Sequence, residues 1–141
     1  MFPGKIAETA PDRPVIVMAG TGETLTYRQL DDGANRVSQL MASHGLRPGD
    51  HVAICLENHP RFFETVWGCH YAGLVYTCCS SRLTTDELAY IINDCAAKLV
   101  VSSAALSAVA RITAVWSAVT LRLSAVSATP ETLASTSLRT S

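Results

Sequence analysis

An excess of charge of one sign is missing from this sequence of 141 residues. Charged residues make up 16% of the chain and nearly cancel, leaving a formal net charge of −1. No run of Lys and Arg interleaved with aromatic residues occurs. Binding to nucleic acid depends on clustered positive charge, so this class of partner has no electrostatic basis here. The length suffices for one modest domain and is too short for two independent cores.

The pattern of cysteines excludes a secreted disulfide framework. Their number is odd, and Cys78 and Cys79 are adjacent, whereas small secreted domains favour an even, spaced set. Proline and charged residues interrupt the start of the chain, so no secretory apolar region follows Met1. We therefore expect a cytoplasmic protein with reduced thiols. The five cysteines are Cys55, Cys69, Cys78, Cys79 and Cys95.

An uninterrupted hydrophobic run of membrane-spanning length is also absent. The stretch 99–121 is mostly apolar and reaches the roughly 20 residues that a bilayer requires. Arg111 lies near its middle, and several Ser and Thr residues dilute it. A central Arg costs about 2.5–3.5 kcal/mol on insertion scales. We therefore expect no membrane span.

What is present in the first hundred or so residues is an alternation of strand and helix signals. Short β-branched or alternating apolar runs predict strands over residues 15–18, 51–56, 74–78 and 98–102, with a returning strand at Leu25. Thr26 with Gln29 and Thr84 with Glu87 form capping boxes, and Pro60 stands at a first helical position. This order predicts an α/β fold: a partial, mostly parallel βαβαβ layer covered by helices. The hairpin and helix at the front should pack on that layer.

Each predicted helix carries apolar residues at helical spacing. We expect these residues to face the core. The three sets are Tyr27, Leu30, Ala34, Val37 and Met41; Phe62, Phe63, Val66, Trp67 and His70; and Leu88, Ile91, Ile92 and Cys95.

Residues 104–141 differ in composition from residues 1–103. More than half of them are Ala, Ser or Thr, Glu131 is the only acid, and no Gly, Asp, Asn or Lys occurs. The apolar residues keep no clean period, so no element is predicted there. We expect an irregular tail that is disordered, or that is translated out of frame from near residue 105.

Four segments occur in order between residues 24 and 103. They are Leu25-Thr26-Tyr27-Arg28-Gln29-Leu30, Gly45 to Ala53 with Pro48-Gly49-Asp50, Asn58 to Phe62 with Ala72-Gly73, and Arg82-Leu83-Thr84 to Asp94. Together they resemble the N-terminal region of the adenylate-forming superfamily, which includes acyl-CoA synthetases, luciferases and peptide-synthetase adenylation domains. Gly73 to Thr77 followed by Arg82-Leu83-Thr84 is most similar to fatty-acyl-CoA synthetases. Cys78 and Ser80 depart from the family, which has Pro and Asn there.

The resemblance implies a reaction for a full-length enzyme. A fatty acid carboxylate attacks the α-phosphorus of ATP, and the thiol of coenzyme A then displaces AMP, with Mg²⁺ neutralising charge. The family's phosphate loop needs several glycines, yet no Gly follows Gly73. The adenine and ribose motifs are also missing, and the only lysines, Lys5 and Lys98, match no catalytic motif. We therefore assign no catalytic, cofactor-binding or metal-binding residue, and we expect a truncated ligase that binds no cofactor alone.

Several residues invite other interpretations. Cys69-His70 with Cys78-Cys79 could ligate a metal, although adjacent strand residues point to opposite faces. Cys79 or Ser80 could act as the nucleophile of a small hydrolase or transferase, but no triad is recognisable. Gly20-Thr21-Gly22 is more typical of a hairpin turn than of a phosphate loop. Asp31-Asp32 fit a helix start, where acids favour the dipole.

An alternative function is an interaction module that binds a full-length ligase or another protein. A parallel sheet that stops after its third strand leaves an edge unpaired, and unpaired edges favour association. We therefore expect a chain that self-associates through its sheet edge and apolar tail.

Overall fold

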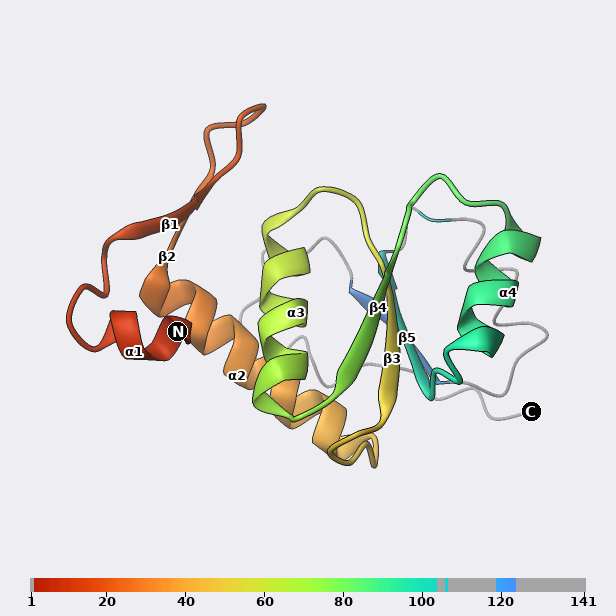
Figure 1. The fold of residues 1–141 in the computed structure, drawn as a ribbon. Coiled ribbons are helices and arrows are strands. Elements are labelled where there is room, and N and C mark those ends of the chain that lie inside the picture. Colours follow the sequence, from red (N-terminus) through yellow and green to blue (C-terminus); the bar gives the residue numbers. More distant parts are fainter. Residues whose placement is uncertain (1, 104–105, 107–118, 124–141) are drawn as a thin grey trace.

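The computed structural model describes residues 2–103, 106 and 119–123 (Figure 1). Its helices are α1 (Pro3–Ala7), α2 (Tyr27–Ser43), α3 (Pro60–Tyr71) and α4 (Thr85–Asp94). Its strands are β1 (Pro14–Val17), β2 (Thr24–Thr26), β3 (His51–Cys55), β4 (Val75–Cys79), β5 (Leu99–Ser103) and β6 (Val119–Leu123). Both predicted capping boxes form, at Thr26 and Thr84.

Strands β3 to β6 form one parallel sheet in the order β4-β3-β5-β6. The chain runs from β3 through α3 to β4, and then back through α4 to β5 on the far side of β3. Because such crossovers are right-handed, this reversal places α3 and α4 on opposite faces of the sheet. The predicted α/β layer is confirmed.

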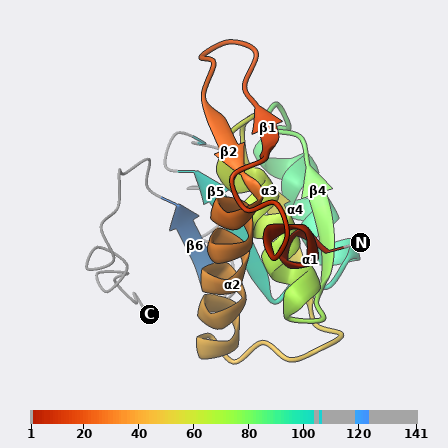
Figure 2. The same cartoon turned by 90° about the vertical axis from the view of Figure 1, so that its left-hand side faces the viewer.

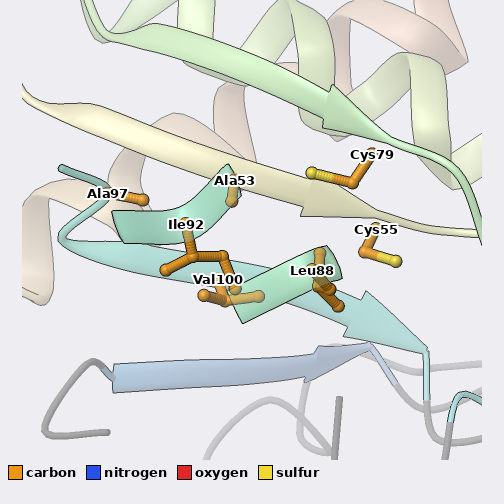
Figure 3. Close-up of a cluster of buried hydrophobic side chains, with 7 residues drawn as sticks. All are labelled: Ala53, Cys55, Cys79, Leu88, Ile92, Ala97 and Val100. Atoms are coloured by element: carbon orange, nitrogen blue, oxygen red, sulfur yellow. The ribbon is translucent and has the colours of Figure 1, made fainter. Parts of the chain in front are cut away.

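Side chains from the strands alternate between two cores. Val52, Ile54, Leu99 and Val101 pack under α2 and α3 with Met41, Cys69 and Leu74. Ala53, Cys55, Cys79 and Val100 pack under α4 with Leu88, Ile92 and Ala97 (Figure 3). Strands that are buried on both faces must be apolar throughout, as β3 is from Val52 to Cys55.

Helices α2 and α3 approach each other closely at Gly68. A Cβ at this position would lie 2.6 Å from Cγ1 and 2.7 Å from Cβ of Val37, and 3.1 Å from the carbonyl oxygen of Ala34. The missing side chain therefore lets α2 dock against α3 and share its core.

The N-terminal segment is held against this helix pair. The Tyr71 hydroxyl on α3 donates to Oδ1 of Asp31 on α2 at 2.6 Å and accepts from the Gly4 amide at 3.2 Å. The Phe2 ring lies 5.9 Å from the Trp67 ring. Figure 2 shows α1 beside α2 and the β1–β2 hairpin extending past the start of α2.

The structure corrects the bounds of three predicted strands and adds a fourth strand to the sheet. Strand β4 begins at Val75 rather than at residue 74, because the Leu74 amide still bonds to the carbonyl oxygen of Cys69 as the chain leaves α3. Strand β3 ends one residue early, and β5 is shifted by one residue toward the C-terminus. Strand β6, which the composition of the tail did not predict, extends the sheet beyond β5.

The core-facing side of α3 also differs from the prediction. Pro60, Thr65 and Cys69 are its buried side chains, and Phe62 and Val66 pack partly buried against the core, whereas Phe63 is 41% exposed. Trp67 and His70 stack on each other with ring centroids 5.2 Å apart, and His70 is exposed. Thr65 tolerates burial because its hydroxyl donates to the Arg61 carbonyl oxygen at 2.8 Å. The spacing of apolar residues along α3 did not show which side of the helix is buried, because these residues cover a broad part of its surface. The predicted sets on α2 and α4 supply Leu30, Ala34, Met41, Leu88 and Ile92 to the buried core.

Candidate functional site

The carboxyl edge of the sheet is the place where this fold would bind a ligand. Helix α3 follows β3 on one face, and α4 follows β4 on the other, so the loops 56–59 and 80–84 leave the sheet in opposite directions. In open parallel sheets, ligands bind in the crevice that such diverging loops create.

The polar groups in these loops are used to build turns and helix ends. Nδ1 of His59 accepts from the Arg61 amide at 3.2 Å, and Oγ of Ser80 accepts from the Arg82 amide at 3.2 Å. The Thr84 amide and hydroxyl donate to Oε2 of Glu87 at 2.9 and 2.8 Å. These bonds lower the pKa of Glu87, the backbone bond contributing most. The loops therefore act mainly as scaffold.

Three buried polar atoms lack a hydrogen-bond partner within the part of the chain that the structure describes. They are Nδ1 of His51, at the start of β3, and the hydroxyl oxygens of Ser102 and Ser103, at the carboxyl end of β5. Ser102 is 1% exposed and lies beside Cys55 in the strand register. This pair was not predicted from the sequence, where its only signal is two serines that close an apolar strand.

The cysteines considered as metal ligands lie on different sides of the sheet. Cys69 lies under α2, where its thiol contacts Sδ of Met41 at 3.7 Å, while Cys79 lies in the α4 core. Cys78 is exposed, and His70 bonds to the Tyr76 hydroxyl at 3.2 Å. Among the described residues, no three His, Cys, Asp or Glu side chains gather to hold a metal ion.

The two candidate nucleophiles gain no support from their surroundings. Burial raises the pKa of Cys79 to about 11, with smaller contributions from Cys55, Cys95 and Cys78, so its thiol stays protonated at neutral pH. The pKa of Cys69 is raised to about 12, again mainly by burial. The hydroxyl of Ser80 holds its own loop together through the Arg82 amide.

The remaining candidates have structural roles. Gly20-Thr21-Gly22 forms the hairpin turn between β1 and β2, with Gly22 at φ +73° and its amide bonded to the Met18 carbonyl oxygen at 2.7 Å. The dipole interpretation of Asp31 is wrong, since the first turn of α2 holds no acid. Asp31 instead accepts the Tyr71 hydroxyl across the helix pair.

The described residues do not fit a nucleotide site. The polar side chains at the carboxyl edge cap and brace their own helices, and no glycine-rich loop follows Gly73. A triphosphate needs a cradle of backbone amides or a cationic clamp. We derive no catalytic step through ATP from these residues.

The arrangement defines a class: an α/β domain with a parallel sheet covered by helices on both faces. A model of the family described as AMP-binding enzyme matches residues 5–139, which include most of the compositionally distinct tail. The chain belongs to this family.

Individual relatives agree with the assignment. The fatty acid–[acyl-carrier-protein] ligase ScoC of Streptomyces coeruleorubidus is 33% identical over 93 residues, which are 66% of this chain and 18% of the relative. Long-chain fatty acid transport protein 1 of Homo sapiens is 35% identical over 96 residues, which are 68% of this chain and 15% of that protein. The chain thus spans less than a fifth of the length of either relative.

Solved structures show the same fold. A fatty acyl CoA synthetase of Mycobacterium tuberculosis superposes with a TM-score of 0.72 at 26% identity, covering 79% of this chain and 22% of that chain. O-succinylbenzoate coenzyme A synthetase of Bacillus subtilis, at 20% identity, shares the fold with a TM-score of 0.72 over 85% of this chain and 30% of its own.

A membrane-spanning helix is not found among the described residues, none of whose helices combines sufficient length with sufficient apolar character.

Proposed function

We propose that this chain is the N-terminal part of a fatty-acid-CoA ligase and that it has no ligase activity alone. The observation that carries the substrate class is the similarity to a fatty acid ligase and to a long-chain fatty acid transport protein, each over about two thirds of the chain. The inactivity is supported by the sequence, which contains neither a phosphate loop nor a lysine that lies within a catalytic motif.

In the full-length enzyme, these residues act as scaffold. ATP, Mg²⁺, coenzyme A and a fatty acid bind to groups that other segments supply. The chain contributes the sheet and the helices on its two faces that support the later site, with the capped loops 56–59 and 80–84 at its ligand-facing edge. The same proposal places the protein in the cytoplasm, with its five thiols reduced.

The test of this proposal is exchange of labelled pyrophosphate into ATP by the purified chain. We expect no exchange above a mock purification with fatty acids of several chain lengths, because the groups that stabilise the transferring phosphoryl are missing. A full-length acyl-CoA synthetase assayed in parallel is the positive control. Exchange that is specific for a fatty acid and co-purifies with the chain would refute inactivity.

The second candidate function is a non-catalytic interaction module. The observation that favours it is the exposed edge strand β4, which pairs with β3 alone among the described strands. Co-elution of the chain with a defined full-length ligase on a sizing column would support this function. Elution of the chain separately from that ligase would count against it.

The division between residues 1–103 and the tail 104–141 stays a prediction. The composition of the tail motivates it, while the strand β6 and the family match through residue 139 both fall beyond the boundary.

A further inference from the structure

Strand β4 is the terminal strand of the sheet in the part of the chain that the structure describes. It pairs with β3 in parallel, with Val75 opposite His51, Thr77 opposite Ala53 and Cys79 opposite Cys55. Its other edge faces away from the sheet. An edge strand of this kind presents a row of unpaired amide and carbonyl groups.

The register fixes which backbone groups those are. The Val75 amide donates to the Asp50 carbonyl oxygen at 3.0 Å, so Val75 directs its backbone toward β3. Because the pattern of a parallel pair repeats every two residues, Thr77 and Cys79 do the same. Tyr76 and Cys78 therefore direct both their amides and their carbonyls outward.

The edge lacks two features that protect many natural edge strands, charged side chains and proline. The segment from Leu74 to Ser81 contains no charged residue and no proline. Val75 is 45% exposed, and Cys78 is exposed. A strand of Val, Tyr, Thr and Cys also has high β-propensity.

We propose that two copies of this chain pair along β4 in antiparallel fashion, with the two-fold axis at Thr77. This register places Tyr76 opposite Cys78 of the second copy and Cys78 opposite its Tyr76, so that all four outward backbone groups of each copy are paired. No other two-fold register pairs both Tyr76 and Cys78. If the axis moves to residue 76 or 78, the other of these two residues no longer lies opposite an outward-facing residue of β4 in the second copy.

The side chains suit this register. Thr77 meets Thr77 of the second copy in the central, non-hydrogen-bonded position, where Thr–Thr pairs are favourable. Val75 and Cys79 lie on the same face of the strand, so the exposed Val75 is covered beside Cys79 of the second copy. An isologous contact of this kind closes as a dimer. It depends on the fold and is independent of ligase chemistry, so failure of pairing leaves the exchange assay unaffected.

The first test is site-directed cross-linking of the full chain in a Cys78→Ser and Cys79→Ala background, because a native Cys79 would face position 75 of the second copy. Thr77→Cys places two thiols on Cα atoms about 4.5 Å apart, within disulfide reach. We expect a mild thiol oxidant to give a covalent dimer. Val75→Cys, on the same face and strand, is the matched control, because its two copies lie about 13 Å apart along the strands and should not cross-link.

The second test is Thr77→Lys, which places like charges directly opposite each other at the axis. We expect sedimentation equilibrium to show a dimer for the parent chain and about tenfold weaker association for the variant. Thr24→Lys on the exposed β2 strand is the control and should remain dimeric. A parent chain that is monomeric at its highest soluble concentration would overturn the proposal. So would equal cross-linking at positions 75 and 77, or a dimer indifferent to Thr77→Lys with an unchanged circular dichroism spectrum.

Discussion

At the scale of single residues, Tyr71 joins three segments that are distant in the sequence. Its hydroxyl links α3 to Asp31 on α2 and to the Gly4 amide of α1. Asp31 is therefore a structural acceptor, and the adjacent pair of acids has no separate chemistry. Gly4 is constrained by the same contact, since a Cβ there would lie 2.7 Å from Oδ1 of Asp31.

Replacing Tyr71 with Phe should remove both hydrogen bonds while preserving the ring contacts. We expect the free energy of unfolding to fall by about 1–2 kcal/mol, because a partly buried carboxylate loses its donor. Urea unfolding measures the change. Tyr90→Phe is the control, since Tyr90 is 70% exposed and its loss should have little effect. Equal stabilities of the two variants would show that the Tyr71 hydroxyl is not a structural link.

The same side chain predicts a dependence on alkaline pH. Burial, followed by the bond to Asp31, raises the pKa of Tyr71 from 10.0 to about 12. The folded state thus holds this proton more tightly than the unfolded state, so the stabilisation is complete below pH 10 and is lost as the pH rises through 12. Between these limits the parent should lose its advantage over Tyr71→Phe. Cys69 and Cys79 titrate in both proteins and cancel from the difference. A stability gap that does not change over this range would contradict the assignment.

At the scale of elements, the contact between α2 and α3 sets the thickness of one core. Gly68→Ala should be destabilising, because overpacking against Val37 and the Ala34 carbonyl costs about 1–3 kcal/mol. The higher helix propensity of Ala offsets only about 1 kcal/mol of this cost. The matched control is Gly33→Ala on α2, where the nearest atoms to the new Cβ all belong to the movable side chain of Glu64. We expect urea unfolding to show a loss at position 68 and little change or a gain at position 33. The reverse order would contradict the close packing of the helices.

Elements with local signals were predictable from the sequence. The capping boxes at Thr26 and Thr84 and the proline that starts α3 located three helices, because these signals are satisfied within one turn. The buried side of α3 was not predictable, since Phe63 and Cys69 have similar apolar character and only the position of α2 decides which is covered. Strand β6 was also missed, because its pairing with β5 comes from a partner distant in sequence rather than from its own composition.

The candidate site depended even more on tertiary contacts. Adjacent cysteines at 78 and 79 already implied divergent side chains, and the structure places one in the α4 core and the other at an exposed position. The unpartnered hydroxyls of Ser102 and Ser103 carry no sequence signal of their own, because burial at the end of β5 is a property of the assembled sheet.

At the scale of the whole molecule, the chain belongs to the AMP-binding enzyme family, and we propose that it acts as scaffold there. Its fold matches that of relatives that are several times longer, and its carboxyl edge supplies turns and caps rather than a phosphate cradle. The proposed inactivity and the proposed pairing along β4 rest on different features of the chain. The inactivity concerns the phosphate loop and catalytic lysine that the sequence lacks, and the pairing concerns an edge that the described strands leave unpaired.

The most direct test of this account is the nucleotide sequence around and beyond codon 105, translated in all three frames. We predict that one frame continues with a Gly-Thr-Thr-Gly phosphate loop and, further on, a catalytic lysine motif. This result would establish the chain as the N-terminal part of a ligase and would show whether residues 104–141 keep the ligase frame. If no frame carries these motifs, the ligase account is contradicted, and the chain must be explained as a self-contained interaction module.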